Sequence, residues 1–145
     1  MRTRRNNKRP RKHGRKTRSR RQKGGTIFTP RTTEELKDAV RRWIRNDREG
    51  LGNISDWDTS NITDMSVLFL NLGSYTFNED ISRWDVSNVT NMESMFDGAD
   101  SFNQPIGSWD VSKVTNMDGM FKYSGYRHVK PSVERSIDRQ NLYNL

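Results

Sequence analysis

Three regularly spaced aspartates, each directly after a tryptophan, are the best candidates in this sequence for binding a metal ion. They are Asp58, Asp85 and Asp110. If equivalent positions stack, the carboxylates would lie about 5 Å apart, and such a column could hold Ca²⁺. The alternative is that each Asp accepts backbone N–H bonds and caps a turn, with Ser60, Ser87 and Ser112 doing likewise. Calcium-binding repeats are denser in Gly and Asp than these repeats are. The sequence therefore favours aspartates that cap turns, and we expect no bound metal.

A second candidate for chemistry is the basic segment of residues 1–26. It holds thirteen Lys and Arg and no acid, so it can displace counterions from a polyphosphate and bind DNA or RNA without sequence preference. It has no aromatic side chain to stack on bases. The same residues satisfy a nuclear import signal. Two further alternatives are that the segment contacts an anionic membrane surface or that it serves only as a solubilising tail. The cations are Arg2, Arg4, Arg5, Lys8, Arg9, Arg11, Lys12, Arg15, Lys16, Arg18, Arg20, Arg21 and Lys23.

Motifs for catalysis are missing from the sequence. The chain has no cysteine, which excludes thiolate nucleophiles, disulfides and Cys-type zinc sites. His13 lies in the basic segment and His128 near the other end of the chain, and no Gly-rich phosphate loop or nucleophile elbow is present. Aspartates at equivalent positions would also have like environments, whereas acid–base pairs need unlike ones. We therefore expect no enzymatic activity and no cofactor.

A repeated sequence supplies the elements that would position the aspartates. The pattern I-x-x-W-D occurs at the start of residues 54–69, 81–96 and 106–121. Self-similarity at this period is typical of solenoids, in which each coil buries its apolar face against the next. Within a coil, β-branched and aromatic residues predict two short strands with a turn between them. Residues 93–99 predict one helical or 3₁₀ turn that ends at Gly98.

Apolar residues at equivalent positions form uninterrupted columns, as the interior of a stack requires. The tryptophans could present an exposed ladder for glycans, and the methionines a metal or adaptable binding face. Regular apolar neighbours favour burial of both. The predicted core consists of Ile54, Trp57, Ile62, Met65, Phe69, Phe77, Ile81, Trp84, Val89, Met92, Phe96, Phe102, Ile106, Trp109, Val114, Met117 and Phe121.

The N-terminal end of the stack needs a cover, and residues 32–46 predict an amphipathic helix that would supply it. Thr32 is the expected N-cap, and Glu35 three residues later completes a capping box. A helix that binds a partner is the alternative interpretation of the same apolar stripe.

The C-terminal end has a weaker signal, because the pattern stops after Tyr126. Residues 127–145 predict a cap or a tail. A weak cap would leave three apolar residues partly open to a partner, namely Trp109, Met117 and Phe121. The predicted organisation is a disordered basic arm at 1–26, a capping-helix segment at 27–49, repeats at 50–126 and the cap or tail at 127–145.

The charge of the chain is strongly divided. The formal net charge is +8, but outside the basic arm thirteen Lys and Arg stand against all eighteen acids, a net charge of −5 by the same count. No apolar run approaches the length of about 20 residues that a membrane span needs, and no secretory signal is recognised. We expect an intracellular protein, of the nucleus or of a virion.

The string F-N-x-x-I-x-x-W-D-V-S-x-V-T-N-M-x-x-M-F fits residues 77–96 and again residues 102–121. It resembles the BspA-like leucine-rich repeat, in the variant catalogued as a mycoplasma surface-protein domain of unknown function. The resemblance implies a right-handed repeat solenoid, a protein-binding or surface role, and no catalytic residues. The basic arm, which ends in K-G-G-T, is similar to arms of small proteins from large DNA viruses that infect algae and protists.

Together these features predict an α/β repeat: a short right-handed leucine-rich-repeat-type solenoid of about three 25-residue coils, with an N-terminal capping helix and a disordered basic arm. The predicted function is a non-catalytic protein–protein interaction module whose arm contacts nucleic acid or directs nuclear import. Two alternatives stay open: a structural protein of a virion or nucleoprotein assembly, and a surface-exposed adhesion-type repeat protein. The protein partner and the oligomeric state are not indicated.

Overall fold

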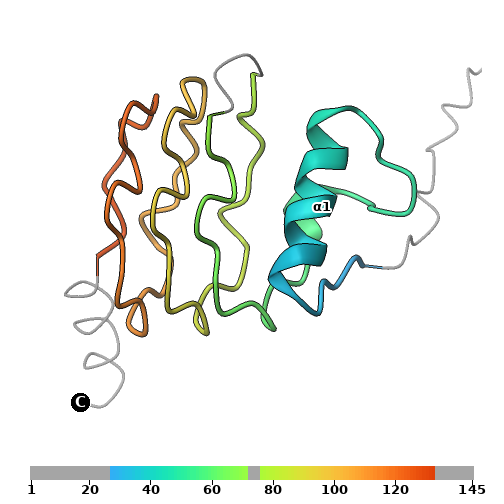
Figure 1. Cartoon of the computed structure of the whole chain (residues 1–145), viewed down its shortest axis with the longest axis horizontal. Helices are drawn as coiled ribbons and strands as arrows, with labels where there is room; N and C mark the ends of the chain where they lie inside the picture. The colour runs from blue at the N-terminus through green and yellow to red at the C-terminus, as the bar shows by residue number, and fades with distance from the viewer. Residues whose placement is uncertain (1–26, 72–75, 133–145) are drawn as a thin grey trace, which may run out of the picture.

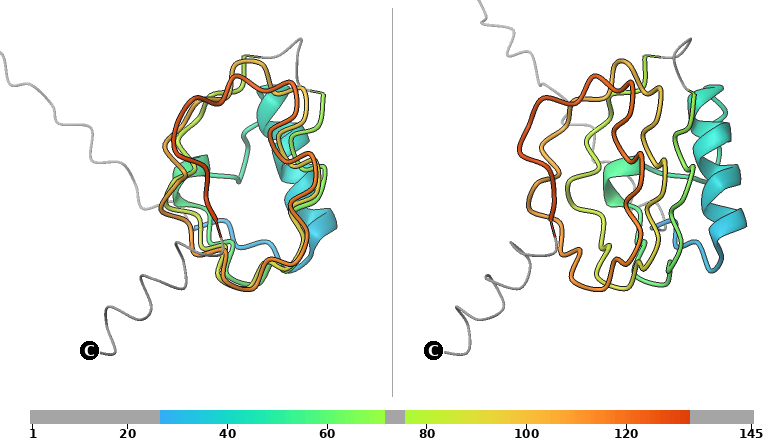
Figure 2. Two further views of the ribbon diagram at one scale, coloured as in Figure 1. Left: turned by 90° about the vertical axis from the view of Figure 1, so that its left-hand side faces the viewer. Right: turned by 60° about the vertical axis from the view of Figure 1, so that its left-hand side comes forward.

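The computed structural model describes residues 27–71 and 76–132, and these form irregular coils stacked side by side with a helix at one end (Figure 1). The helix is α1 (Thr33–Ile44), and a short 3₁₀ turn, η1 (Ile54–Asp56), follows it. Viewed along the stack, the outlines of the coils superimpose (Figure 2). The basic arm predicted at 1–26 and most of the predicted C-terminal cap lie outside the described residues.

Helix α1 forms because its sequence caps it and gives it one apolar face. The Thr32 side-chain oxygen accepts from the Glu35 backbone N–H at 3.1 Å, and the Glu35 carboxylate accepts from the Arg31 N–H at 2.7 Å. The buried face consists of Leu36, Ala39, Val40 and Trp43. This face lies against the first coil, where the Thr33 hydroxyl donates to the Asp64 carbonyl at 2.9 Å. The helix therefore covers the N-terminal end of the stack.

The predicted α/β leucine-rich-repeat solenoid is wrong. Among residues 27–71 and 76–132 there is no sheet, and two isolated parallel bridges stand where strands were expected. The bridges join Asp64 to Asn91 and Asn91 to Asn116. The helical or 3₁₀ turn predicted at 93–99 is also absent, and that segment consists of hydrogen-bonded turns.

Left-handed residues explain why the helical turn predicted at 93–99 does not form. In the second coil Ser94 and Gly98 have φ of 49° and 70°, and the value at Ser94 is incompatible with a right-handed helical turn. The chain instead closes turns, in which the Met95 N–H donates to the Met92 carbonyl at 3.2 Å and the Ala99 N–H to the Phe96 carbonyl at 3.1 Å. Positive φ recurs at the equivalent positions of the other coils, at Val67, Asn71, Gly119 and Tyr123. We call residues 64–71, 91–98 and 116–123 the turn segments.

Hydrogen bonds between turn segments join each coil to the next. Alternate N–H groups of one coil donate to alternate carbonyls of the following coil, at 2.8–2.9 Å. The donor–acceptor pairs are Met65–Asn91, Val67–Glu93, Phe69–Met95 and Asn71–Asp97, followed by Met92–Asn116, Ser94–Asp118, Phe96–Met120 and Gly98–Lys122. The stack therefore has a direction, because amide donors of each turn segment point toward the C-terminal end.

Stacked aromatic rings fill the interior between the coils. Phe69, Phe96 and Phe121 form one column, with ring centroids 5.2 and 5.6 Å apart. Of the seventeen predicted core residues, all but Met117 and Phe121 are buried. The buried residues also include a column that the sequence analysis did not identify, made of Thr59, Val86 and Val111.

Candidate functional site

The three aspartates that follow the tryptophans each cap a turn. Asp58 accepts from the Ser60 N–H at 3.1 Å and from its hydroxyl at 2.7 Å. Asp85 has the same two contacts with Ser87, at 3.0 and 2.7 Å, and Asp110 accepts from the Ser112 N–H at 3.0 Å. Ser60 and Ser87 thus donate to the aspartates, rather than accepting backbone bonds as expected. The Asp58 hydrogen bonds, first from the Ser60 hydroxyl and then from its N–H, hold the pKa of this carboxyl below its usual value.

A second series of side-chain caps opens the turn segments, and the sequence analysis missed it. Asp64, Asn91 and Asn116 accept the N–H of the residue two positions later, at 2.7, 3.1 and 3.0 Å. Burial raises the pKa of Asp64, but the Ser66 N–H and hydroxyl, the charge of Lys37 and a hydrogen bond from Asn91 together leave the pKa below its usual value. The recurring Asp or Asn just before each column methionine was the available signal.

Metal ligands do not gather in the part of the chain that the structure describes: no group of three His, Cys, Asp or Glu side chains there has a metal-binding arrangement. The repeated aspartates instead direct Oδ1 at their own turns.

The repeated tryptophans are interior residues. Trp57, Trp84 and Trp109 are each 3% exposed, so they do not form a surface ladder. The indole N–H of Trp57 donates to the Leu51 carbonyl at 2.7 Å, and that of Trp84 donates to the Ile54 carbonyl at 2.8 Å. The expectation that Trp109 would be partly open is wrong, because the chain after Tyr126 passes over the start of the third coil. The Val129 carbonyl lies 2.5 Å from where a Cβ on Gly107 would be.

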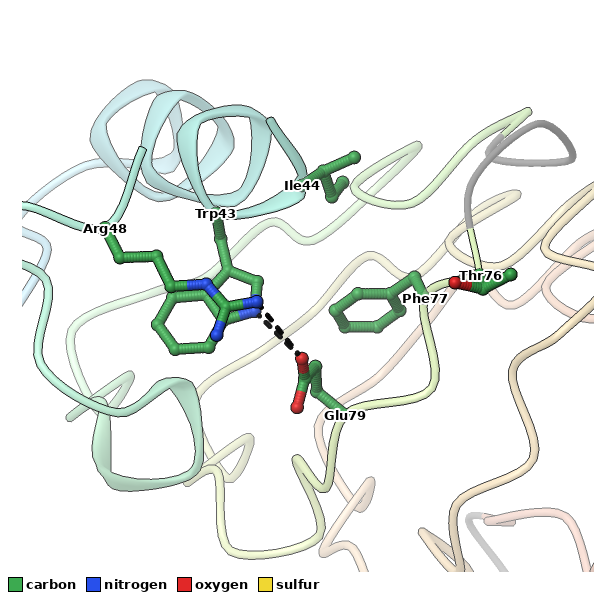
Figure 3. Close-up of a pocket in the computed structure, with 6 residues that line it drawn as sticks. All are labelled: Trp43, Ile44, Arg48, Thr76, Phe77 and Glu79. Atoms are coloured by element: carbon green, nitrogen blue, oxygen red, sulfur yellow. Dashed lines mark hydrogen bonds and ion pairs between the residues drawn. The ribbon is translucent and has the colours of Figure 1, made fainter. Parts of the chain in front are cut away.

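A small hollow of about 170 Å³ lies where α1 meets the stack (Figure 3). The Arg48 guanidinium lies over the Trp43 ring, 4.1 Å from its centroid. The Glu79 carboxylate lies 3.4 Å from the Trp43 indole nitrogen and 3.6 Å from Arg48. The polar groups in this hollow therefore contact one another, and the arrangement fastens the helix to the second coil.

The C-terminal end of the stack has a larger and more apolar hollow, of about 370 Å³. Met117 and Phe121 are partly exposed there, whereas their counterparts in the two earlier coils are 0% exposed. The Lys130 ammonium lies over the Phe121 ring, 5.6 Å from its centroid. We call this surface the open end; it is lined by Met117, Gly119, Met120, Phe121, Lys122, Lys130 and Pro131. Of the predicted binding residues, the structure brings only Met117 and Phe121 together here.

The predicted nucleic-acid residues, Arg2 to Lys23, lie outside the described residues. His128 is described: its Nε2 lies 3.0 Å from the Asn103 carbonyl, in the segment that covers the start of the third coil.

Comparison with known families matches residues 38–131, which contain the end of α1 and all the coils, to the family described as "Mycoplasma protein of unknown function, DUF285". The chain belongs to the DUF285 family. This family is the one that the W-D-V-S-x-V-T-N-M string indicates. No curated protein and no solved structure matches the chain. In this DUF285 protein no helix among the described residues is long and apolar enough to cross a membrane.

Proposed function

We propose that this DUF285 protein is a non-catalytic protein–protein interaction module whose basic arm contacts nucleic acid or directs nuclear import. The observation that carries the proposal is the difference between the two ends of the stack. Helix α1 covers the N-terminal end, whereas Met117 and Phe121 remain partly exposed at the open end. Apolar side chains beside lysines, on a stack whose other apolar columns are buried, are typical of a surface that a partner covers.

Charge supports the role of the arm. Thirteen cations without an acid in residues 1–26 precede a body with a net charge of −5 by the same count. The acidic body would not by itself approach a polyphosphate, so binding would depend on the arm.

Binding of the full chain to a random-sequence DNA duplex over a salt series tests the arm. Each phosphate contact contributes about 0.9 to the slope of log K against log salt. Replacing Arg18, Arg20 and Arg21 by Gln should lower that slope by about 2–3. The control removes the same charge from exposed positions of the body, Arg31, Arg41 and Arg45, and should leave the slope unchanged. Equal slopes for the two variants would contradict nucleic-acid contact by the arm, and loss of nuclear accumulation alone would favour import.

A structural protein of a virion or nucleoprotein assembly is the second candidate, favoured by the same acid-free arm. In that role the arm would neutralise packaged phosphate, and the similarity of the arm to those of small proteins from large DNA viruses would reflect common use. Co-sedimentation of the native protein with particles, after nuclease treatment, would support this candidate over the first.

A further inference from the structure

The open end presents a row of amide donors that the rest of the stack uses for pairing. In the third turn segment the N–H groups of Met117, Gly119, Phe121 and Tyr123 stand where their counterparts donate to a following coil. No acceptor meets these four N–H groups within residues 27–71 and 76–132. Like the edge strand of a β-sheet, this row presents unpaired backbone donors to a further segment, although its own backbone consists of turns.

The chain that follows the third coil covers only the other half of this end. The Tyr126 hydroxyl donates to the Val129 carbonyl at 2.9 Å, and the Arg127 N–H donates to Asn103 at 2.8 Å. These contacts place the Val129 carbonyl against Gly107, while the Tyr126 ring packs on Phe121 with centroids 4.4 Å apart. Lys130 and Pro131 then form the far wall of the hollow beside Met117 and Phe121. A groove with a row of donors along one side is left at the C-terminal end of the stack. This end of the stack is turned toward the viewer in the left view of Figure 2.

Hydrogen-bond polarity argues against a second copy of this chain in the groove. Two copies related by a two-fold axis would place the donor row of one against the donor row of the other. A head-to-tail copy would have to offer the carbonyls of its first turn segment, but the Thr33 hydroxyl of α1 already donates to the first of them, that of Asp64. The occupant must instead supply free backbone carbonyls at alternate residues.

The charge of the residues around the groove indicates which side chains the occupant should carry. Residues 54–71 carry three acids and no cation, and residues 76–105 carry six acids and one cation. Residues 106–132 reverse this balance, with four Lys and Arg against two Asp. Lys122 and Lys130 belong to this cationic end and border the groove itself. A partner segment with acidic side chains therefore complements the groove.

We propose that the third turn segment and the Lys130–Pro131 wall form a docking groove for an acidic segment of a partner protein, which takes up the conformation of a turn segment and adds its backbone carbonyls to the row of donors. This inference rests on the proposed interaction function and names the surface that serves it.

A synthetic peptide with the sequence of residues 86–100, V-S-N-V-T-N-M-E-S-M-F-D-G-A-D, is a suitable probe. Within the chain its carbonyls at Asn91, Glu93, Met95 and Asp97 accept from the equivalent donors of the first coil, and it carries three acids. Added to the full-length protein, it should slow hydrogen exchange at the amides of Met117, Gly119, Phe121 and Tyr123 at least tenfold. A scrambled peptide of the same composition controls for attraction to the basic arm and should leave these four amides unchanged.

Charge reversal at the groove provides the matched variants. Lys122→Glu with Lys130→Glu should weaken peptide binding at least tenfold, whereas Arg31→Glu with Arg45→Glu, at the opposite end, should not. Equal effects of the two peptides on the four amides, or amides already protected without peptide, would overturn the docking groove. Protection by a second copy would appear as concentration dependence and would overturn it too.

Co-purification separates this inference from the proposed function. If a cellular protein co-purifies equally with the parent chain and the Lys122→Glu, Lys130→Glu variant, the interaction function stands and the groove is not its site. If no protein co-purifies with either chain, the interaction function itself fails. Loss of a co-purifying protein only in the variant, together with peptide protection, would support the groove.

Discussion

Each tryptophan of the repeat both packs in the interior and supports the backbone of another segment. Trp84 is 3% exposed, lies 5.9 Å from Trp57 in a stacked arrangement, and donates its indole N–H to the Ile54 carbonyl of the previous coil. A single side chain therefore joins two coils by apolar contact and by a buried hydrogen bond.

Truncation of this side chain should strongly destabilise the protein. We expect Trp84→Ala to lower the free energy of unfolding by about 3–5 kcal/mol, because it leaves a cavity between coils. Trp84→Phe keeps much of the packing and loses the indole hydrogen bond, so it should cost less. Urea unfolding followed by circular dichroism measures both. A cost under about 1 kcal/mol for Trp84→Ala would contradict a shared interior.

Aspartate caps should make stability fall in acid. The pKa values of Asp58 and Asp80 are lowered by hydrogen bonds from the hydroxyls and then the N–H groups of Ser60 and Ser82. A carboxyl with a lowered folded pKa contributes stability above its unfolded value of about 3.9, and that contribution is lost as the pH falls through the folded pKa. Asp58→Asn with Asp80→Asn keeps an accepting oxygen that does not titrate in this range. The urea midpoint of the double variant should therefore decline less between pH 5 and pH 2 than that of the parent chain.

At the scale of elements, the sequence predicts the helix well and the coils poorly. Residues 32–46 were predicted helical and α1 spans Thr33–Ile44, because the Thr32 cap and the apolar spacing act locally. Strands were wrongly predicted from β-branched and aromatic residues, because the chain closes turns there: the Trp84 N–H donates to the Ile81 carbonyl at 3.1 Å, and the Val89 N–H donates to the Val86 carbonyl at 2.9 Å. The left-handed backbone at Ser94 in turn excludes the helical turn predicted at 93–99. Gly98 and Gly119 were the visible signals of a left-handed backbone, whereas Val67 and Tyr123 have positive φ without a glycine to indicate it.

The candidate site was predictable only in part for the same reason. The end of the repeat pattern after Tyr126 indicates an incomplete cover at the C-terminal end, and Met117 and Phe121 are partly exposed there. Which half of the C-terminal end stays open depends on the position of residues 126–132. Long-range contacts, such as the hydrogen bond between Arg127 and Asn103, determine that position.

Removal of the helix cap should have a modest, measurable effect. Thr32→Ala deletes the acceptor for the Glu35 N–H, so it should lower the free energy of unfolding by about 1 kcal/mol. Thr32→Ser keeps the acceptor and is the control. Thermal or urea unfolding of the three chains makes the comparison, and equal stability of Ala and Ser at this position would contradict the cap.

Residues 126–132, which cover part of the C-terminal end, require a glycine at position 107. The other copies have Ser55 and Ser82 at this position, but a Cβ here would lie 2.5 Å from the Val129 carbonyl. Gly107→Ser should displace residues 126–132 and lower the free energy of unfolding by about 1–3 kcal/mol. Hydrogen exchange should quicken at Arg127 in this variant. Ser55→Gly makes the reverse change in the first coil, which has no such cover, and should leave hydrogen exchange at Arg127 unchanged.

At the scale of the whole molecule, the stack is asymmetric in charge and in hydrogen bonding. The acidic first two coils are followed by a cationic third coil, and the amide donors that join the turn segments point toward that end. In the free protein, hydrogen exchange should therefore be slow at Met92, Ser94, Phe96 and Gly98. It should be at least about 100-fold faster at Met117, Gly119, Phe121 and Tyr123. Similar rates in the two sets would show that the donors of the last coil are satisfied.

The one-way hydrogen bonding between turn segments bears on how such proteins change length. Since every junction uses the same alternation of donors and carbonyls, tandem duplication of one coil's coding sequence would create a junction identical to those already present. Gain or loss of whole units would alter the reach of the protein while conserving both termini of the stack. Insertions inside a turn segment would break the alternation, whereas the two extra residues between Phe69 and Phe77, compared with Phe96 and Phe102, leave it intact. Selection should therefore tolerate whole units and changes outside the turn segments, and reject changes within them.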